Sequence, residues 1–279
     1  MGSAGYRWPR STPSVVSVPI EGGGRAVRRR IVTFTGGLGA QILSAGIYFN
    51  AEFSSQEIYA DLRYFQQPAR AARLGTGEVS VWPWHLGIYG HEMSRFRSAM
   101  PRRHIDTLVE DGVPKLELAL AAFLEPRVRE QFPLGTLADA QLASQVTDAA
   151  VIHLRRGDYL NVASHIVDDK VVGRLLSPLA ELVRHVVLVS DGPISGELLS
   201  LTSGLFEGVR DASDLPWDQA HTAMRMARVL VTSNSQFSLA AGLLREHGLT
   251  ITPAKWGGPE SAKLEQCVAL TSDFRILRT

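Results

Sequence analysis

Two adjacent arginines stand at the end of an apolar run in the middle of the chain. The run covers residues 151–154 and is followed by Arg155, Arg156, Gly157 and Asp158. Arginine is seldom buried without a partner, so two guanidiniums at the end of a core strand require anionic groups nearby. Their planar forks bind phosphate oxygens bidentately. The pattern predicts a phosphate or diphosphate site, with the alternative that one arginine only braces the loop by pairing with Asp158.

A second polar stretch, Ser233-Asn234-Ser235-Gln236, follows another short apolar run, and Phe237 begins the helical pattern behind it. Serine and asparagine are preferred N-cap residues, so capping that helix is one interpretation. The same position offers free backbone N–H groups and the positive end of the helix dipole, which together attract anions. The stretch is therefore a candidate to act with Arg155 on the same anion.

A glycine-rich turn, residues 36–39, lies between a predicted strand at 31–34 and a predicted helix at 40–50. It is not a dinucleotide fingerprint, because Ile42 stands where the last glycine of that pattern belongs, and it is not a P-loop, because no Gly-Lys-Ser/Thr follows. A strand, a glycine turn and a helix are nonetheless the usual start of a nucleotide-binding α/β unit.

The elements that must position these residues alternate in the second half of the chain. The apolar spacing predicts helices at 168–184, 218–228 and 237–247, and strands at 185–191, 229–232 and 249–252. Such alternation indicates a parallel sheet with right-handed crossovers, whose carboxyl strand ends open into a ligand crevice. Asp191 ends one of these strands and His153 lies in another, so both are candidates to face a nucleotide.

The stretch from 61 to 146 has a poorer signal, apart from a predicted helix at 116–123. An aromatic cluster, Trp82-Pro83-Trp84-His85 with Tyr89 and His91 close behind, lies within it. Such rings either stack on sugars or fill a core, and the sequence leaves both roles open. The histidines at 85, 91 and 104 follow no metal-ligand spacing.

The composition is that of an ordinary globular protein. The chain has 279 residues, of which 45% are hydrophobic and 20% charged, and its net charge of +1 gives no nucleic-acid signature. Cys267 is the one cysteine, so no internal disulfide can form and a reducing compartment is expected. No apolar run is long enough to span a bilayer.

Residues 1–29 contain three prolines, a run of three glycines and several arginines, and we expect a flexible basic tail. Polar residues between Thr33 and Ser44 interrupt the apolar stretch behind the arginines, which argues against a signal peptide. A solvated basic flank and a weak contact with anionic lipid at the inner membrane face are the two interpretations of this run.

Four motifs resemble, in family order, those of the α-1,2-fucosyltransferases of glycosyltransferase family 11. Residues 153–159 resemble its HxRRxDY motif, and residues 36–41 resemble GGLGNQ, with Ala40 in place of the asparagine. Residues 231–238 resemble IISNSSFSWWG, although Leu239 and Ala240 replace the paired tryptophans, and residues 253–256 resemble PKKW.

The resemblance implies a GT-B-like α/β fold of two Rossmann-type domains with parallel sheets. Behind the tail it implies an acceptor-side domain at 30–146 and a donor-binding domain at 147–279. The implied enzyme is a bacterial, cytoplasmic, inverting transferase that moves L-fucose from GDP-fucose to a glycan hydroxyl, in α-1,2 linkage to galactose or a related sugar. No metal ion or other cofactor is expected, and the basic run admits a peripheral contact with the membrane.

The resemblance also implies a set of site residues. Arg155, His165 and Asp158 are the expected catalytic residues, with Arg155 on the β-phosphate. The sequence alone leaves His165, Asp168 and Asp158 as the candidate bases. The expected donor-binding residues are Gly37, Gly39, Gln41, His153, Arg155, Arg156, Asp191, Ser233, Asn234, Ser235, Gln236 and Phe237. A GDP-sugar and a glycan are the expected partners, nucleic acid is not, and the oligomeric state stays open.

Three rival hypotheses remain at this point. The same fold can serve another sugar nucleotide. The departures at Ala40, Leu239 and Ala240 leave open a nucleotide-binding protein that has lost turnover. Arg156-Gly157-Asp158 also spells a cell-adhesion tripeptide, which we discount because it adjoins a core strand.

Overall fold

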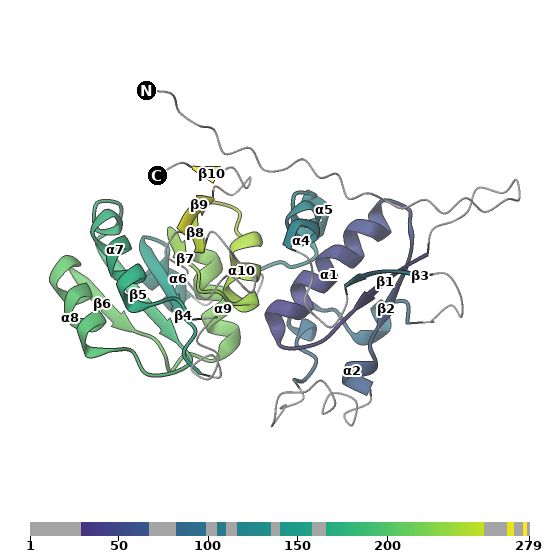
Figure 1. The fold of residues 1–279 in the computed structure, drawn as a ribbon, viewed down its shortest axis with the longest axis horizontal. Coiled ribbons are helices and arrows are strands. Elements are labelled where there is room, and N and C mark those ends of the chain that lie inside the picture. The colour runs from purple at the N-terminus through teal and green to yellow at the C-terminus, as the bar shows by residue number, and fades with distance from the viewer. Residues whose placement is uncertain are drawn as a thin grey trace, which may run out of the picture.

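The computed structural model describes residues 29–66, 82–98, 105–109, 116–134, 140–157, 166–253, 267–270 and 276–277. Its helices and strands form two α/β units side by side, with the chain passing from the purple N-terminal unit to the green C-terminal unit (Figure 1). The predicted tail at 1–29 lies outside the described residues except for Arg29.

The N-terminal unit is built around one long helix. In chain order its elements are β1 (Arg29–Thr33), α1 (Leu38–Phe53), β2 (Glu57–Asp61), α2 (Arg63–Gln66), the 3-10 turns η2 (Leu86–Tyr89) and η3 (Met93–Arg95), β3 (Ile105–Val109), α4 (Leu116–Phe123) and α5 (Pro126–Glu130). The strands pair in parallel in the order β2-β1-β3. Almost every side chain of α1 is buried, as expected for a helix that is apolar all round.

The C-terminal unit holds the larger sheet. Its elements are α6 (Ala140–Val146), β4 (Ala149–Leu154), α7 (Asp169–Ala180), β5 (His185–Ser190), α8 (Gly196–Leu205), β6 (Gly208–Asp211), α9 (Trp217–Met226), β7 (Val229–Val231), α10 (Gln236–Leu243), β8 (Leu249–Pro253), β9 (Cys267–Leu270) and β10 (Ile276–Leu277). The order is β10-β9-β8-β7-β4-β5-β6. The strands from β8 to β6 are parallel, and β9 and β10 add an antiparallel edge.

Two α/β units with parallel sheets confirm the predicted fold class. The predicted strands and helices of the second half are all present, but the three predicted helices all end earlier than the apolar spacing suggested, the one predicted at 218–228 ending at Met226. The helix predicted at 168–184 ends at Ala180, and the one predicted at 237–247 ends at Leu243. The helix that ends at Leu243 is followed by Arg245, whose buried side chain donates to the carbonyl oxygen of Met224 near the end of α9.

The link between the units lies earlier than the boundary predicted after residue 146. Val128 and Phe132 pack in the hydrophobic cluster around α1. Leu142 and Val146 of α6 pack instead against β4, β5 and α9. Contacts across the chain therefore assign α6 to the C-terminal unit.

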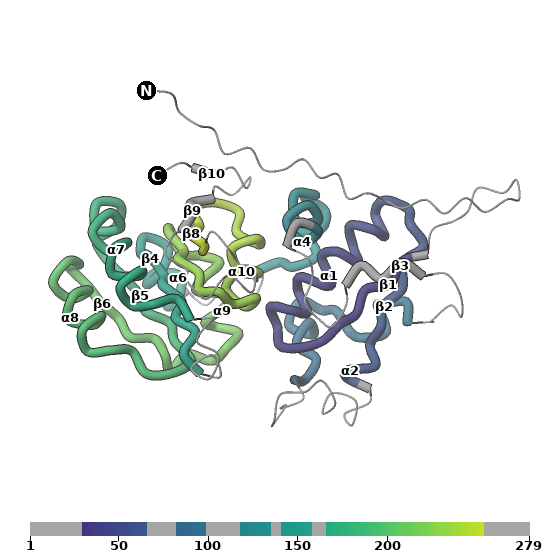
Figure 2. Tube along the Cα trace, viewed as in Figure 1, coloured from purple at the N-terminus to yellow at the C-terminus, as the bar shows by residue number. Residues whose placement is uncertain are grey.

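Helix α10 joins the two cores. Leu239, Ala240 and Leu243 of this helix, and Leu244 at its C-cap, belong to the cluster around α1, although their sequence neighbours pack with the larger sheet. Figure 2 shows α10 at the junction beside α1. The close approach of these helices fixes how the two sheets face each other.

The buried Arg245 guanidinium caps the C-terminal end of α9. It is 1% exposed and donates to the carbonyl oxygens of Met224 at 2.8 Å, Ala227, and Arg228 at 3.2 Å. These carbonyls have no partner in the helix, and the helix dipole makes that end negative. Burial lowers the pKa of Arg245 to about 10, so the side chain is charged at neutral pH.

Replacing this arginine is expected to destabilise the fold. Arg245→Met keeps an apolar stem but leaves buried carbonyls without donors, which costs about 2–3 kcal/mol of unfolding free energy. Urea denaturation followed by circular dichroism measures the loss. The exposed Arg228 is the matched control, because Arg228→Met should change stability by less than about 0.5 kcal/mol. Equal stability of the two variants would contradict the capping role.

Candidate active site

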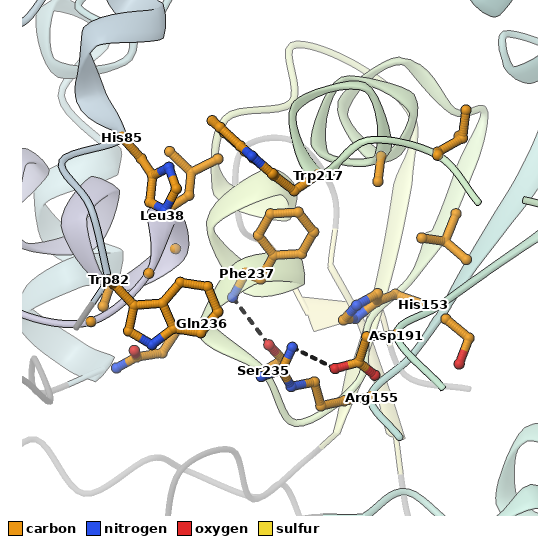
Figure 3. A pocket seen from close by; sticks show the side chains of 18 of the residues that line it. Leu38, Trp82, His85, His153, Arg155, Asp191, Trp217, Ser235, Gln236 and Phe237 are labelled. Carbon is orange, nitrogen blue, oxygen red and sulfur yellow. Dashed lines mark hydrogen bonds and ion pairs between the residues drawn. The ribbon is translucent and has the colours of Figure 1, made fainter. Parts of the chain in front are cut away.

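A cavity of about 440 Å³ lies between the two units. Its wall includes the turn after β1, the ends of β4 and β5, and the first turns of α1, α9 and α10. Figure 3 shows its labelled side chains, with Trp82 and His85 on the N-terminal side and His153, Arg155 and Asp191 on the other. The carboxyl ends of parallel strands open into a crevice at such a place, so its location is the one the sequence predicted.

Arg155 lines the cavity and forms an ion pair there. It directly follows β4, and Asp191 directly follows β5; the parallel register pairs Leu154 with Ser190, so the two residues emerge side by side. Arg155 Nη1 lies 2.6 Å from Asp191 Oδ2. Asp191 Oδ1 accepts the backbone N–H groups of Arg156 at 2.5 Å and Gly157 at 2.9 Å. The backbone thus fixes the carboxylate, and the carboxylate holds the guanidinium in the cavity (Figure 3).

Arg156 points elsewhere and does not line the cavity. Its side chain is buried, donates from Nη1 to the carbonyl oxygen of Val167 at 2.9 Å, and pairs with Asp169 at the start of α7. The structure therefore corrects its predicted place among the donor-binding residues and favours the loop-bracing alternative, with Asp169 as a partner. A buried, paired guanidinium also cannot serve the adhesion tripeptide.

His153 is both a hydrogen-bonded core residue and a residue of the cavity wall. Its Nδ1 lies 2.8 Å from Ser233 Oγ. Burial lowers the pKa of His153 to about 4, so the ring is neutral at pH 7. Ser233 and Asn234 are themselves buried and lie behind the wall, not on it. Their predicted donor contact is thus corrected to a supporting place, in which Ser233 orients His153.

Two helix N-termini face the cavity. Ser235 is the N-cap of α10, and its Oγ accepts the N–H of Phe237 at 3.2 Å. Helix α1 has Gly37 at its N-cap, with no side-chain cap and no acidic residue in its first turn. Both first turns line the cavity, as does Gln236. Together with Arg155 they supply positive potential and N–H donors, which is the composition of an anion site.

Gly39 makes this convergence possible. A Cβ on Gly39 would lie 2.3 Å from the carbonyl carbon of Gln236 and from the nitrogen of Phe237, so only glycine lets α1 approach α10 this closely. Gly36 adopts a φ of +68°, which favours glycine in the turn before it. Gly37 and Gly39 both line the cavity, where sequence reasoning expected them.

Gln41 does not reach the cavity, which corrects its predicted ligand contact. The side chain is fully buried, and Nε2 donates to the carbonyl oxygens of Gly36 at 2.8 Å and Pro83 at 2.9 Å. Its Oε1 accepts the N–H of His85 at 2.8 Å. Gln41 therefore pins the segment that carries Trp82 and His85 to the glycine turn.

The aromatic cluster divides between the two roles left open. Trp84 packs against Phe34 and Phe96 and donates its indole N–H to the carbonyl oxygen of His91 at 2.7 Å, which is a core role. Trp82 and His85 line the cavity. Trp217, at the start of α9, faces them across the cavity and was not predicted as a site residue. The only local feature of the sequence that marks its position is the preceding proline, which indicates the start of a helix.

Two expected catalytic residues, Asp158 and His165, lie outside the described residues, and their roles stay predictions. Asp168, a candidate base, is exposed and is the N-cap of α7, accepting the N–H of Lys170 at 2.7 Å. It does not line the cavity. Its geometry is that of a helix cap.

The described ranges contain neither a metal-binding cluster nor a helix that could cross a membrane. Within them, no three His, Cys, Asp or Glu side chains are grouped to hold a metal ion. In the same part of the chain, no helix combines the length and apolar character needed to cross a bilayer.

Comparisons with known proteins gave matches at the level of structure alone. No protein-family model and no curated protein matches the chain. A crystal structure of POFUT1 with GDP-fucose is similar at a TM-score of 0.45 and 10% identity, covering 81% of this chain and 96% of that one. NodZ α-1,6-fucosyltransferase soaked with GDP-fucose is similar at a TM-score of 0.39 and 14% sequence identity, covering 81% of this chain and 95% of that one. The fucosyltransferase NodZ from Bradyrhizobium is similar at a TM-score of 0.39 and 14% sequence identity, covering 81% of this chain and 94% of that one.

Proposed function

We propose that the protein is an inverting glycosyltransferase that moves L-fucose from GDP-fucose to a hydroxyl of a glycan. The observation that carries this is the convergence of Arg155 with the first turns of α1 and α10 on one cavity between two α/β units. When the bond from the sugar to the diphosphate breaks, negative charge grows on the leaving phosphate. Fixed donors aimed at that charge stabilise the transition state more than the ground state.

The choice of donor rests on the sequence motifs. Four stretches resemble those of the α-1,2-fucosyltransferases, and of these Gly37, Gly39, His153, Arg155 and Ser235 line the cavity. A volume of about 440 Å³ is within the ordinary range for a small-molecule site. Transfer in α-1,2 linkage to galactose or a related sugar is part of the proposal and is supported by the same motifs.

Thermal denaturation with nucleotides tests the proposal. A ligand that binds the native state stabilises it by about 2.7 kcal/mol at a hundred times its Kd. We expect GDP and GDP-fucose to raise the Tm and UDP, CDP and ADP to leave it near that of the free protein. A rise in Tm only with a nucleotide that carries another nucleobase would indicate that the donor is another sugar nucleotide. GDP binding without transfer or donor hydrolysis would indicate a protein without turnover, and no shift with any nucleotide would refute the proposal.

Transfer is expected to survive chelation. The chain contains no Asp-x-Asp pair, and Arg155 with two helix N-termini supplies positive charge where a divalent ion would otherwise sit on the diphosphate. Rates measured in EDTA should stay within about twofold of rates in buffer, a difference of about 0.4 kcal/mol. Added Mn²⁺ is the control and should give no increase. Activity abolished by EDTA and restored by Mn²⁺ would contradict this.

A further inference from the structure

Two tryptophans are exposed within the cavity wall, one from each unit. Trp82 is 40% exposed and Trp217 is 42% exposed, and both line the cavity. Ligand sites are concave and lined largely by hydrophobic and aromatic side chains, so two indole rings in one cavity wall suit a ligand with an apolar face. The apolar C–H face of a sugar ring suits such a surface, while its hydroxyls stay in contact with water or polar groups.

His85 lies between these rings. Its ring centroid is 4.4 Å from that of Trp217, edge to face, and 6.2 Å from that of Trp82. The His85 ring forms no hydrogen bond to any other residue that the structure describes. Figure 3 shows it on the side of the cavity opposite Arg155 and Asp191.

The backbone of His85 is held in place from beneath. Gln41 Oε1 accepts its N–H at 2.8 Å, and its carbonyl oxygen accepts the N–H of Ile88 at 3.2 Å in the turn that opens η2. Since Gln41 is fully buried and also binds Pro83, it positions both the imidazole and Trp82. A ring that is fixed at its backbone, and whose nitrogens bond to none of the described residues, is positioned to meet a ligand.

The charge state of His85 fits a proton acceptor. Burial lowers its pKa from the usual value near 6.5, so at pH 7 the ring is neutral and carries a lone pair. The charged groups that share the wall, Arg155 and Asp191, are paired with each other, and His153 is neutral at that pH. Among the described residues of the cavity wall, Asp191 is thus held by Arg155 and the His153 ring is bonded to Ser233, which leaves His85 as the base that can accept the proton.

We propose that Trp82 and Trp217 bind the acceptor sugar ring and that His85 is the catalytic base that takes the proton from its reacting hydroxyl. This inference rests on the proposed function and adds its acceptor subsite. The acceptor is a pyranose whose apolar face contacts the tryptophans and whose hydroxyl donates to the imidazole.

The step balances without any further reactant. The acceptor oxygen forms a bond to C1 of the donor sugar while the bond from C1 to the β-phosphate oxygen breaks. GDP leaves with that electron pair near Arg155. The acceptor proton passes to His85, which returns it to water after the product leaves.

The first test uses His85→Gln, with His247→Gln on the exposed surface as the matched histidine control. General base catalysis contributes about 10²–10⁴-fold, so kcat for transfer from GDP-fucose to lactose or N-acetyllactosamine should fall by at least about 10²-fold. The Kd for GDP should stay within twofold of the wild type in both variants, which reports an intact donor site. His247→Gln should keep wild-type kcat.

Two readouts separate a base from a merely structural residue. Wild-type kcat should fall as the pH drops through the lowered pKa of His85, because the protonated ring cannot accept a proton, and His85→Gln should lose this acid limb. In His85→Ala, added imidazole should restore part of the lost rate. Transfer with wild-type kcat and pH profile in His85→Gln would overturn the assignment of the base.

The tryptophans are tested through the acceptor. Trp82→Ala and Trp217→Ala should each raise KM for lactose at least about tenfold, about 1.4 kcal/mol, and leave KM for GDP-fucose near the wild-type value. Lactose should also quench tryptophan fluorescence of the wild type in the presence of GDP. No quenching and no transfer with any galactoside, while GDP still binds, would overturn the acceptor subsite alone. Absent GDP binding would instead refute the proposed function.

Discussion

Arg155→Lys is expected to lower sugar transfer by about 10²-fold or more, comparable to removing one oxyanion donor at about 3 kcal/mol. Lysine keeps the charge but replaces a planar fork with a single ammonium, which cannot pair with Asp191 and bind a phosphate with the same geometry. Arg155 Nη1 is anchored 2.6 Å from Asp191 Oδ2, and the side chain is 20% exposed at the cavity wall. The loss should fall mainly on kcat, since the charge on the phosphate is greatest in the transition state.

The neighbouring arginine provides the control for this variant. Arg156 is buried against Val167 and Asp169, outside the cavity, so Arg156→Lys should lower the unfolding free energy while folded molecules keep near-normal turnover. The comparison needs steady-state rates, GDP affinity by calorimetry and urea denaturation for both variants. Folded Arg155→Lys protein with wild-type kcat would remove Arg155 from the mechanism.

The sequence predicted those features that depend on neighbouring residues. Apolar runs and helical spacing located β4, β5, α9 and α10, and a residue that follows a strand within a few positions had to lie near its carboxyl edge. Arg155, Asp191 and Ser235 were therefore predicted at the wall where the structure has them. Once the strands are parallel and adjacent, the register of Leu154 with Ser190 brings Arg155 to Asp191 without further information.

Contacts between distant segments were not predictable in the same way. Gln41 was expected to bind the ligand, but it reaches Pro83 and His85, which are more than forty residues away. His153 is paired with Ser233 across eighty residues. Trp217 faces His85 only because the two units pack together. Such pairings depend on how whole elements dock, and no local pattern carries that information.

Two of the motifs each contain residues that line the cavity and a residue that lies behind its wall and supports it. Within residues 36–41, Gly37 and Gly39 line the cavity and Gln41 stands behind it holding the acceptor-side segment. Within residues 233–237, Ser235 and Gln236 line the cavity and Ser233 stands behind it holding His153. Each motif therefore places a helix N-terminus at the cavity and also holds another part of its wall, which is the backbone at Pro83 and His85 in the first case and the His153 side chain in the second.

Gly39→Ala is expected to damage the site and the fold together. Helix propensity alone predicts the opposite, because alanine in a helix is more stable than glycine by about 0.5–1 kcal/mol. The structure decides against propensity. The new Cβ would lie 2.3 Å from Gln236 C and Phe237 N and 2.4 Å from Gln236 O, all backbone atoms that cannot rotate away. Helix α10 must shift, and overpacking of this kind costs about 1–3 kcal/mol of unfolding free energy.

The displacement of α10 in Gly39→Ala moves the N-termini of α1 and α10 apart where, in the proposed function, both contact the diphosphate of the donor. A displacement of about 1 Å at a reacting group can cost about 10²-fold in rate, and we expect a loss of that size in transfer, with weaker GDP binding. Gly204→Ala in α8 is the matched control: nothing lies within 4 Å of its new Cβ, so the same exchange should stabilise the protein slightly and leave turnover unchanged. Urea denaturation and steady-state rates measure both variants. If Gly39→Ala behaved like Gly204→Ala, α1 could not lie against α10 as closely as the structure has it, and the convergence that supports the proposed function would be lost with it.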